Sequence, residues 1–225
     1  VFSFLKFEEK NKSARLDEVG NTTRDTGRSL LIIAKQPRYI VALLSGMLGY
    51  SVMSFVMTAT PLAMDQSAFL FNDTAIVIQW HVLAMFAPSF VTGILIARFG
   101  VIKILFSGVV FGFLCVGINL HGMSFWHYLM ALVCLGISWN FLFVGSTSMI
   151  TDTYEEKEKN KAQALNDFAV FSMVTVASLS SGVLQNAFGW QLVNIGAIPL
   201  LLVILFALIW LVIKNRVNSE LKLEI

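Results

Sequence analysis

Residues 168–213, FAVFSMVTVASLSSGVLQNAFGWQLVNIGAIPLLLVILFALIWLVI, contain no lysine, arginine, aspartate or glutamate. A helix needs about 20 apolar residues to cross a hydrocarbon core about 30 Å thick. This stretch is therefore long enough for two crossings. Residues 104–151 form a second stretch without these charged side chains and of similar length. Two such stretches predict at least four membrane-spanning segments.

The whole chain shares this apolar character. Hydrophobic residues make up 56% of it and charged residues 13%, about half the charged share of a soluble domain. In lipid, only helices and closed β-barrels satisfy every backbone group, and these apolar runs are too long and continuous for barrel strands. The predicted fold class is therefore all-α, a polytopic membrane protein with six transmembrane helices.

Positive charge is distributed between connections in a regular way. The six expected spans are residues 39–62, 74–97, 101–120, 125–150, 166–188 and 190–213. Eight lysines and arginines precede the first span, two lie near residues 98–103, three lie in 157–161 and three follow residue 213, while the other three connections have none. The positive-inside rule then places both termini in the cytoplasm. We expect a multi-pass protein of the inner (plasma) membrane.

One turn carries a family resemblance. Residues 93–103 are GILIARFGVIK, in which Gly93, Arg98, Gly100 and Lys103 resemble the loop between the second and third helices of major facilitator superfamily transporters. That loop recurs more weakly between their eighth and ninth helices. Ala97 stands where the family has aspartate, which removes the acidic partner for a helix-end contact.

The resemblance implies an architecture for the whole chain. Residues 39–213 would be the C-terminal six-helix half of a major-facilitator-type bundle. Residues 1–38 would be the end of a preceding helix plus the cytoplasmic loop between the halves, and residues 214–225 a cytoplasmic tail. The chain would then be a fragment whose partner is a missing N-terminal six-helix half. The stretches 79–100, 136–140 and 165–168 are also similar to a bacterial permease subgroup.

The turn also has a physical interpretation without the family. Gly93 would let its helix approach a neighbour closely, Arg98 would bind helix-end carbonyls, and Gly100 would permit a tight reversal. A cytoplasmic gating loop that includes Lys103 and a purely stabilising loop are both consistent with this pattern.

Polar side chains inside the apolar spans are candidates for solute binding or ion coupling, because such groups are costly in lipid. His81 lies about two turns inside the second span, and Met85, Ser89 and Thr92 continue its stripe at helical spacing. Histidine titrates near neutral pH, so His81 is a candidate to carry a proton or donate to a substrate. A neutral histidine bonded to a neighbouring helix is the alternative. Gln79 flanks His81 and is a further candidate.

Aromatic and amide groups extend the candidate set. Trp139 and Asn140 lie in the inner half of the fourth span, where tryptophan would stack on a planar substrate and asparagine would hydrogen-bond it. Packing between helices is the alternative for both. Tyr50 in the first span would line a cavity for an amphipathic molecule. Asp167 is the deepest carboxylate and the acidic proton-carrier candidate, although capping the start of a helix is an alternative role.

The sequence predicts transmembrane secondary transport of a small organic solute by alternating access, with protons as a candidate coupling ion. It contains no phosphate-binding loop, zinc-protease motif or nucleophile elbow, so we expect no enzyme activity, no cofactor and no metal site. The apolar helices exclude nucleic acid as a partner; the partners expected are the solute and the lipid bilayer. A half-size accessory or assembly protein that acts by helix association is the alternative function.

Overall fold

All regular secondary structure is helical in the part of the chain that the structure describes, residues 27–221 of a computed structural model. The helices are α2 (Leu30–Ala34), α3 (Pro37–Gln66), α4 (Phe71–Phe86), α5 (Ser89–Phe99), α6 (Val101–His121), α7 (Phe125–Thr151), the short 3-10 helix η1 (Glu156–Glu158) and α8 (Lys159–Leu221). The all-α membrane fold is thus confirmed. The predicted end of a preceding helix at residues 1–5 and most of the predicted inter-half loop lie outside the described residues.

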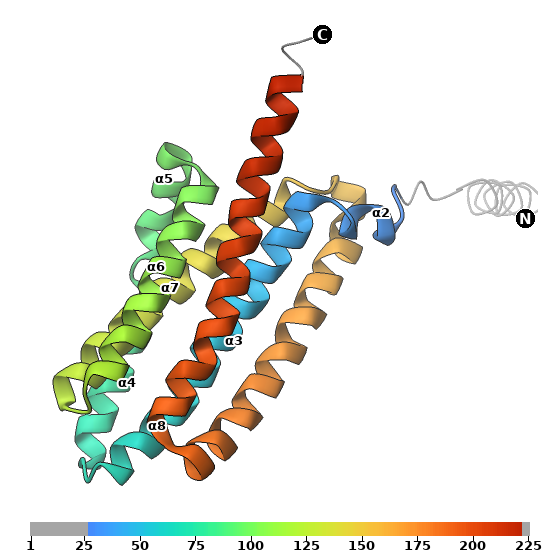
Figure 1. Cartoon of the computed structure of the whole chain (residues 1–225). Helices are drawn as coiled ribbons and strands as arrows, with labels where there is room; N and C mark the ends of the chain where they lie inside the picture. Colours follow the sequence, from blue (N-terminus) through green and yellow to red (C-terminus); the bar gives the residue numbers. More distant parts are fainter. Residues whose placement is uncertain (1–26, 222–225) are drawn as a thin grey trace, which may run out of the picture.

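Four described helices, α3, α6, α7 and α8, are long and apolar enough to cross a membrane. A fifth span results if α4 and α5, which meet at a 40° bend, are taken as one. The long helix α8 contains a non-helical residue, Gly189 (φ 78°, ψ 179°), and Figure 1 shows its two limbs running antiparallel. Dividing α8 there accounts for two of the expected spans. How many segments cross a bilayer stays a prediction.

Proline and glycine account for several helix ends. Pro37 occupies the first turn of α3, where its missing N–H is not needed. Gly100 connects α5 to α6 with φ 87° and ψ 146°, a left-handed backbone that favours glycine. The prediction that Gly100 permits a tight reversal is therefore confirmed.

The cation-bearing connections gather at one end of the bundle. Figure 1 shows α2, the α5–α6 turn, the α7–α8 connection and the far end of α8 at the same end. The α3–α4 and α6–α7 turns and the reversal at Gly189 lie at the opposite end. This arrangement is the one that alternating cationic and cation-free connections require.

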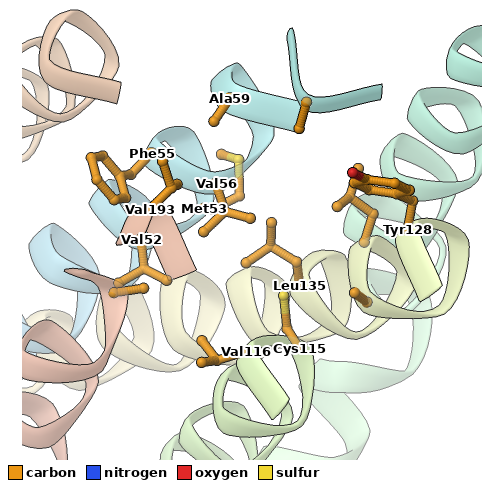
Figure 2. Close-up of a cluster of buried hydrophobic side chains, with 14 of the residues drawn as sticks. Val52, Met53, Phe55, Val56, Ala59, Cys115, Val116, Tyr128, Leu135 and Val193 are labelled. Atoms are coloured by element: carbon orange, nitrogen blue, oxygen red, sulfur yellow. The ribbon is translucent and has the colours of Figure 1, made fainter. Parts of the chain in front are cut away.

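The core is packed across α3, α6, α7 and α8. Figure 2 shows Leu135 of α7 between Met53 and Val56 of α3 and Cys115 of α6. Deeper toward the cation-rich end, Leu142 of α7 fills a space left by glycines on two helices: a Cβ added at Gly49 or Gly108 would lie 2.8 Å from its side chain. Small residues at these positions let the helices approach closely.

Candidate functional site

The second predicted span is not one straight helix. Residues 74–97 were expected to be continuous, but the chain forms α4 and α5 with a break at Ala87 and Pro88 and a bend of 40°. Proline has no N–H to donate, and its ring clashes with the carbonyl four residues earlier. The expectation of a single helix is therefore wrong in its middle.

Asn140 of α7 lies against this break. Its Nδ2 donates to the Met85 carbonyl at 2.7 Å and to Ser89 Oγ at 2.6 Å, and its Oδ1 accepts from Thr92 Oγ1 at 2.6 Å. The side chain is fully buried. Asn140 thus bonds residues on both sides of the bend, and the helix-packing alternative describes its contacts in this structure.

His81 is buried in the same interface between α4 and α7. Its Nδ1 lies 2.8 Å from the Leu132 carbonyl oxygen, and since a carbonyl only accepts, Nδ1 carries a hydrogen and donates it. Its Nε2 is buried and has no hydrogen-bond partner among the described residues. A Cβ at Gly136 would lie 2.7 Å from the His81 carbonyl oxygen, so glycine permits this close approach. His81 is bonded to a neighbouring helix and keeps one free acceptor nitrogen.

Five aromatic side chains from four helices form what we call the aromatic cluster. Its centre is Trp139, which stacks on Phe143 (ring centroids 5.1 Å apart, planes at 8°) and meets Tyr50 edge-on at 5.4 Å. Phe86 contacts Trp139 edge-on at 5.8 Å, and Phe171 lies 6.4 Å from Tyr50. The members are Tyr50 of α3, Phe86 of α4, Trp139 and Phe143 of α7, and Phe171 of α8.

The aromatic cluster is buried at its centre and open on one side. Trp139 is buried and its indole Nε1 has no partner among the described residues. Phe86 is 56% exposed and Phe171 is 59% exposed, so both rings lie at a surface that no other described residue covers. An indole N–H is a donor only, and here it is unused beside stacked rings.

Two predicted site residues lie apart from the aromatic cluster. Gln79 is exposed on α4 and no described contact joins it to His81. Asp167 is exposed on α8 and accepts a hydrogen bond from Asn166 Nδ2 at 3.1 Å. Because α8 begins at Lys159, Asp167 lies more than two turns inside the helix. The alternative that Asp167 caps a helix start is therefore wrong.

The predicted gating loop is only partly as expected. A Cβ added at Gly93 would meet nothing within 4 Å in the described chain, so the expected close helix approach at Gly93 is not made there. The Arg98 guanidinium lies 5.5 Å from the centroid of the Phe99 ring, and Lys103 is exposed. Whether Gly93, Arg98, Gly100 and Lys103 gate transport stays a prediction.

A contact that sequence reasoning missed lies at the cation-rich end. Arg28 donates from Nε and Nη2 to Glu158, with the Nη2–Oε2 pair at 2.7 Å, and Arg28 Nη2 also donates to the Thr153 carbonyl at 3.1 Å. The Glu158 side chain is buried, and Arg28 is partly exposed. Hydrogen bonding from Arg28 lowers the pKa of Glu158 to about 2. We call this ion pair the Arg28–Glu158 clasp.

Sequence reasoning also missed two rings of the aromatic cluster. Phe143 follows Trp139 by four residues, a spacing that places both on one helix face, so the sequence held a signal for that pair. Phe171 is 32 residues beyond Trp139 along the chain and had no such signal.

A cavity of about 590 Å³ runs along α6 to His121 and His127, but its lining contains no member of the aromatic cluster.

These observations define a helical polytopic membrane protein with an aromatic, partly open site between four of its helices. The chain matches the sequence profile of the Major Facilitator Superfamily over residues 11–224. It belongs to that family.

Curated relatives are transporters by name. A riboflavin transporter, RfnT, of Brucella anthropi is 44% identical over 189 residues, which cover 84% of this chain and 48% of the relative. The uncharacterized transporter YdeG of Bacillus subtilis is 30% identical over 162 residues, covering 68% of this chain and 36% of the relative. YddS of the same organism, also uncharacterized, is 26% identical over 161 residues, covering 71% and 37%. The chain thus spans no more than about half of these relatives. No solved structure matches it.

Proposed function

We propose that the protein containing this chain moves a small planar aromatic solute of the riboflavin class across the plasma membrane. The observation that carries the proposal is the aromatic cluster. Its rings come from α3, α4, α7 and the first limb of α8, so a bound solute would contact four helices at once. Sites of this kind, apolar with a few placed polar groups, are typical for small ligands.

The chemistry of a flavin ring suits the aromatic cluster. A flat heteroaromatic ring stacks on aromatic faces, and its carbonyl and ring nitrogen atoms accept hydrogen bonds. Trp139 offers one unused indole N–H, and the Tyr50 hydroxyl is a second polar group at the same place. The riboflavin transporter at 44% identity makes riboflavin the first solute to test.

Alternating access would need a second six-helix half. The exposed edges of Phe86 and Phe171 leave the aromatic cluster open on the side where such a half would cover it. The riboflavin transporter of Brucella anthropi is about twice as long as the region that matches this chain. In this proposal the halves rotate about the solute site, and this chain supplies the C-terminal half.

Proton coupling is a further part of the proposal. His81 has a buried ring nitrogen without a partner, and Asp167 is an exposed carboxylate on the helix that also carries Phe171. Both groups would bind and release protons during the cycle. In the complete protein, His81→Ala or Asp167→Asn should abolish the increase in uptake that an imposed inward proton gradient produces. An increase of normal size in both variants would remove His81 and Asp167 as proton carriers, and no increase in the unmodified protein would remove protons as the coupling ion.

The test uses labelled riboflavin and the complete protein in proteoliposomes. Trp139→Leu should weaken solute binding about tenfold, because an aromatic pair contributes about 0.5–1.5 kcal/mol beyond its buried area and 1.4 kcal/mol is a factor of ten. The matched control is Trp126→Leu, since Trp126 lies on the same helix, outside the aromatic cluster, and is 64% exposed. Equal uptake by the two variants at equal abundance would refute the assignment of this site.

A further inference from the structure

The bend between α4 and α5 separates two segments that are held very differently. In α4, Val77, His81 and Met85 are buried, whereas Thr92 is the one buried residue of α5. Phe90 of α5 is 87% exposed. The arm formed by α5 therefore buries few side chains against the rest of the described chain.

One amide holds this arm to the bundle. Asn140 donates to the Met85 carbonyl in the last turn of α4 and to the Ser89 hydroxyl in the first turn of α5, at 2.7 and 2.6 Å. Its Oδ1 lies 2.6 Å from Thr92 Oγ1, and the Pro88 carbonyl oxygen lies 2.8 Å from the same hydroxyl, so the two oxygens share the one hydrogen that Thr92 donates. Both amide hydrogens and the amide oxygen of Asn140 are thus used within a single turn of the break.

The same place touches the aromatic cluster. Trp139 precedes Asn140 on α7, and its ring meets Phe86, the last residue of α4, with centroids 5.8 Å apart. A change in the stacking of Trp139 would therefore act on the residue next to the bend. Trp139 and Asn140 are consecutive on α7, and both contact the last turn of α4, through Phe86 and Met85.

We propose that Asn140 is a positioning residue that latches the α4–α5 bend, and that α5 moves as a gate arm when the latch opens. The bend requires Pro88, the latch requires the amide of Asn140, and the Trp139–Phe86 contact connects both to the solute site. The part of this inference that concerns solute transport rests on the proposed function. The part that concerns the position of α5 does not.

The position of α5 can be measured by spin-label distances in the complete protein in nanodiscs. Labels would replace Ile94 of α5 and Val110 of α6, both exposed. The background variant would have Cys115 and Cys134 of this chain replaced. The unmodified latch should give one narrow distance distribution. Asn140→Leu should broaden or shift it. The matched control is Ser138→Ala, on the same helix as Asn140. It removes a buried bond to the Gly108 carbonyl of α6 and should leave the distance distribution unchanged.

A gentler pair of variants guards against failure of Asn140→Leu to fold. Thr92→Ser keeps the hydroxyl that donates to Asn140 and should behave as the unmodified protein, while Thr92→Val has nearly the same shape without the hydroxyl and should broaden the distribution. Identical distributions for these two variants would overturn the proposal, as would an unchanged distribution in folded Asn140→Leu.

Transport kinetics separate a latch from a solute contact. If Asn140 acts on α5, Asn140→Leu should lower the maximal uptake rate about tenfold and leave the solute KM nearly unchanged. A raised KM with a normal maximal rate would instead make Asn140 a solute-binding residue and overturn the latch. Absence of riboflavin uptake by the unmodified protein would refute the proposed function, while the distance measurement would still decide the latch.

Discussion

Two interruptions of regular helix in this molecule are held together by side chains from distant parts of the chain, but with opposite chemistry. At the α4–α5 bend the partners are an amide and two hydroxyls, all neutral. At the α7–α8 connection the partners are the guanidinium and carboxylate of the Arg28–Glu158 clasp. The first lies within a predicted membrane span and the second among charged residues at the cation-rich end.

The difference follows from the cost of desolvating charge. A neutral amide in hydrocarbon needs only its hydrogen-bond partners, whereas an ion there also loses its hydration. Close to water, an ion pair with several donors on one carboxylate gives stronger bonds than an amide does. The chain therefore uses neutral groups where its helix breaks inside the bundle and charged groups where it turns outside. A charged group placed at the bend should therefore destabilise the fold more than a neutral group placed at the ion pair.

The largest effect is expected from Asn140→Asp. The substitution keeps the shape, removes both donors and places a carboxylate beside the Met85 carbonyl. We expect the free energy of unfolding to fall by about 3 kcal/mol or more, because breaking a buried polar site and leaving a charge there is strongly destabilising. Thermal unfolding in detergent at neutral pH would measure it. Lowering the pH should restore part of the loss, since protonation removes the charge.

Asn140→Asp also has an informative failure. A melting temperature equal to that of the unmodified protein would mean that water reaches the bend. The difference between an amide site that excludes water and an ion pair close to water would then be lost.

The next effect concerns the packing that brings α7 to the bend. A Cβ at Gly136 would lie 2.7 Å from the His81 carbonyl oxygen and 2.9 Å from the Met85 backbone nitrogen. Backbone atoms cannot move aside easily, so Gly136→Ala should destabilise by about 1–3 kcal/mol. The matched control is Gly117→Ala on α6, where the added Cβ would meet nothing within 4 Å. That change should be neutral or stabilising. Equal melting temperatures would contradict the close approach.

The smallest effect is expected at the Arg28–Glu158 clasp. Glu158→Gln removes the charge, so backbone amides of residues 29–34 should exchange hydrogen a few times faster. Asp152→Asn is the control, because its pair with Arg38 is exposed on both sides. The pKa of Glu158 is lowered from 4.5 to about 2, so the clasp contributes fully above pH 4.5 and loses its contribution as pH falls toward 2. The difference between Glu158→Gln and the unmodified protein should shrink over that interval. A difference that persists unchanged would exclude the ion pair as its cause.

The helical membrane fold could be predicted because apolar runs are long and cations alternate, and both are local properties of the sequence. The bend at Pro88 could not, since proline alone does not decide it. Pro61 lies inside α3 and Pro199 inside α8 without ending either helix. At the bend, Asn140 bonds Met85 and Ser89 on the two sides of Pro88, and only the folded structure shows that it lies there.

The site was partly predictable for the same reason. Tyr50 and Trp139 were expected from residue type and depth, and the structure brings them into contact. Phe171 and the Arg28–Glu158 pair depend on which helices become neighbours, which one sequence does not reveal. Gln79 was chosen because it lies close to His81 in the sequence, but residues two positions apart on a helix do not face each other. The roles of all six site candidates stay predictions.

The reversal within α8 has a consequence for biogenesis. Gly189 alone separates two apolar limbs, so no hydrophilic segment exists there to be transferred across the bilayer on its own. The predicted topology then requires the limbs to enter as one hairpin, with Lys159 and Lys214, near its two ends, on the same side of the bilayer. A charged insertion at this single residue would oblige the membrane insertion machinery to carry ions through lipid.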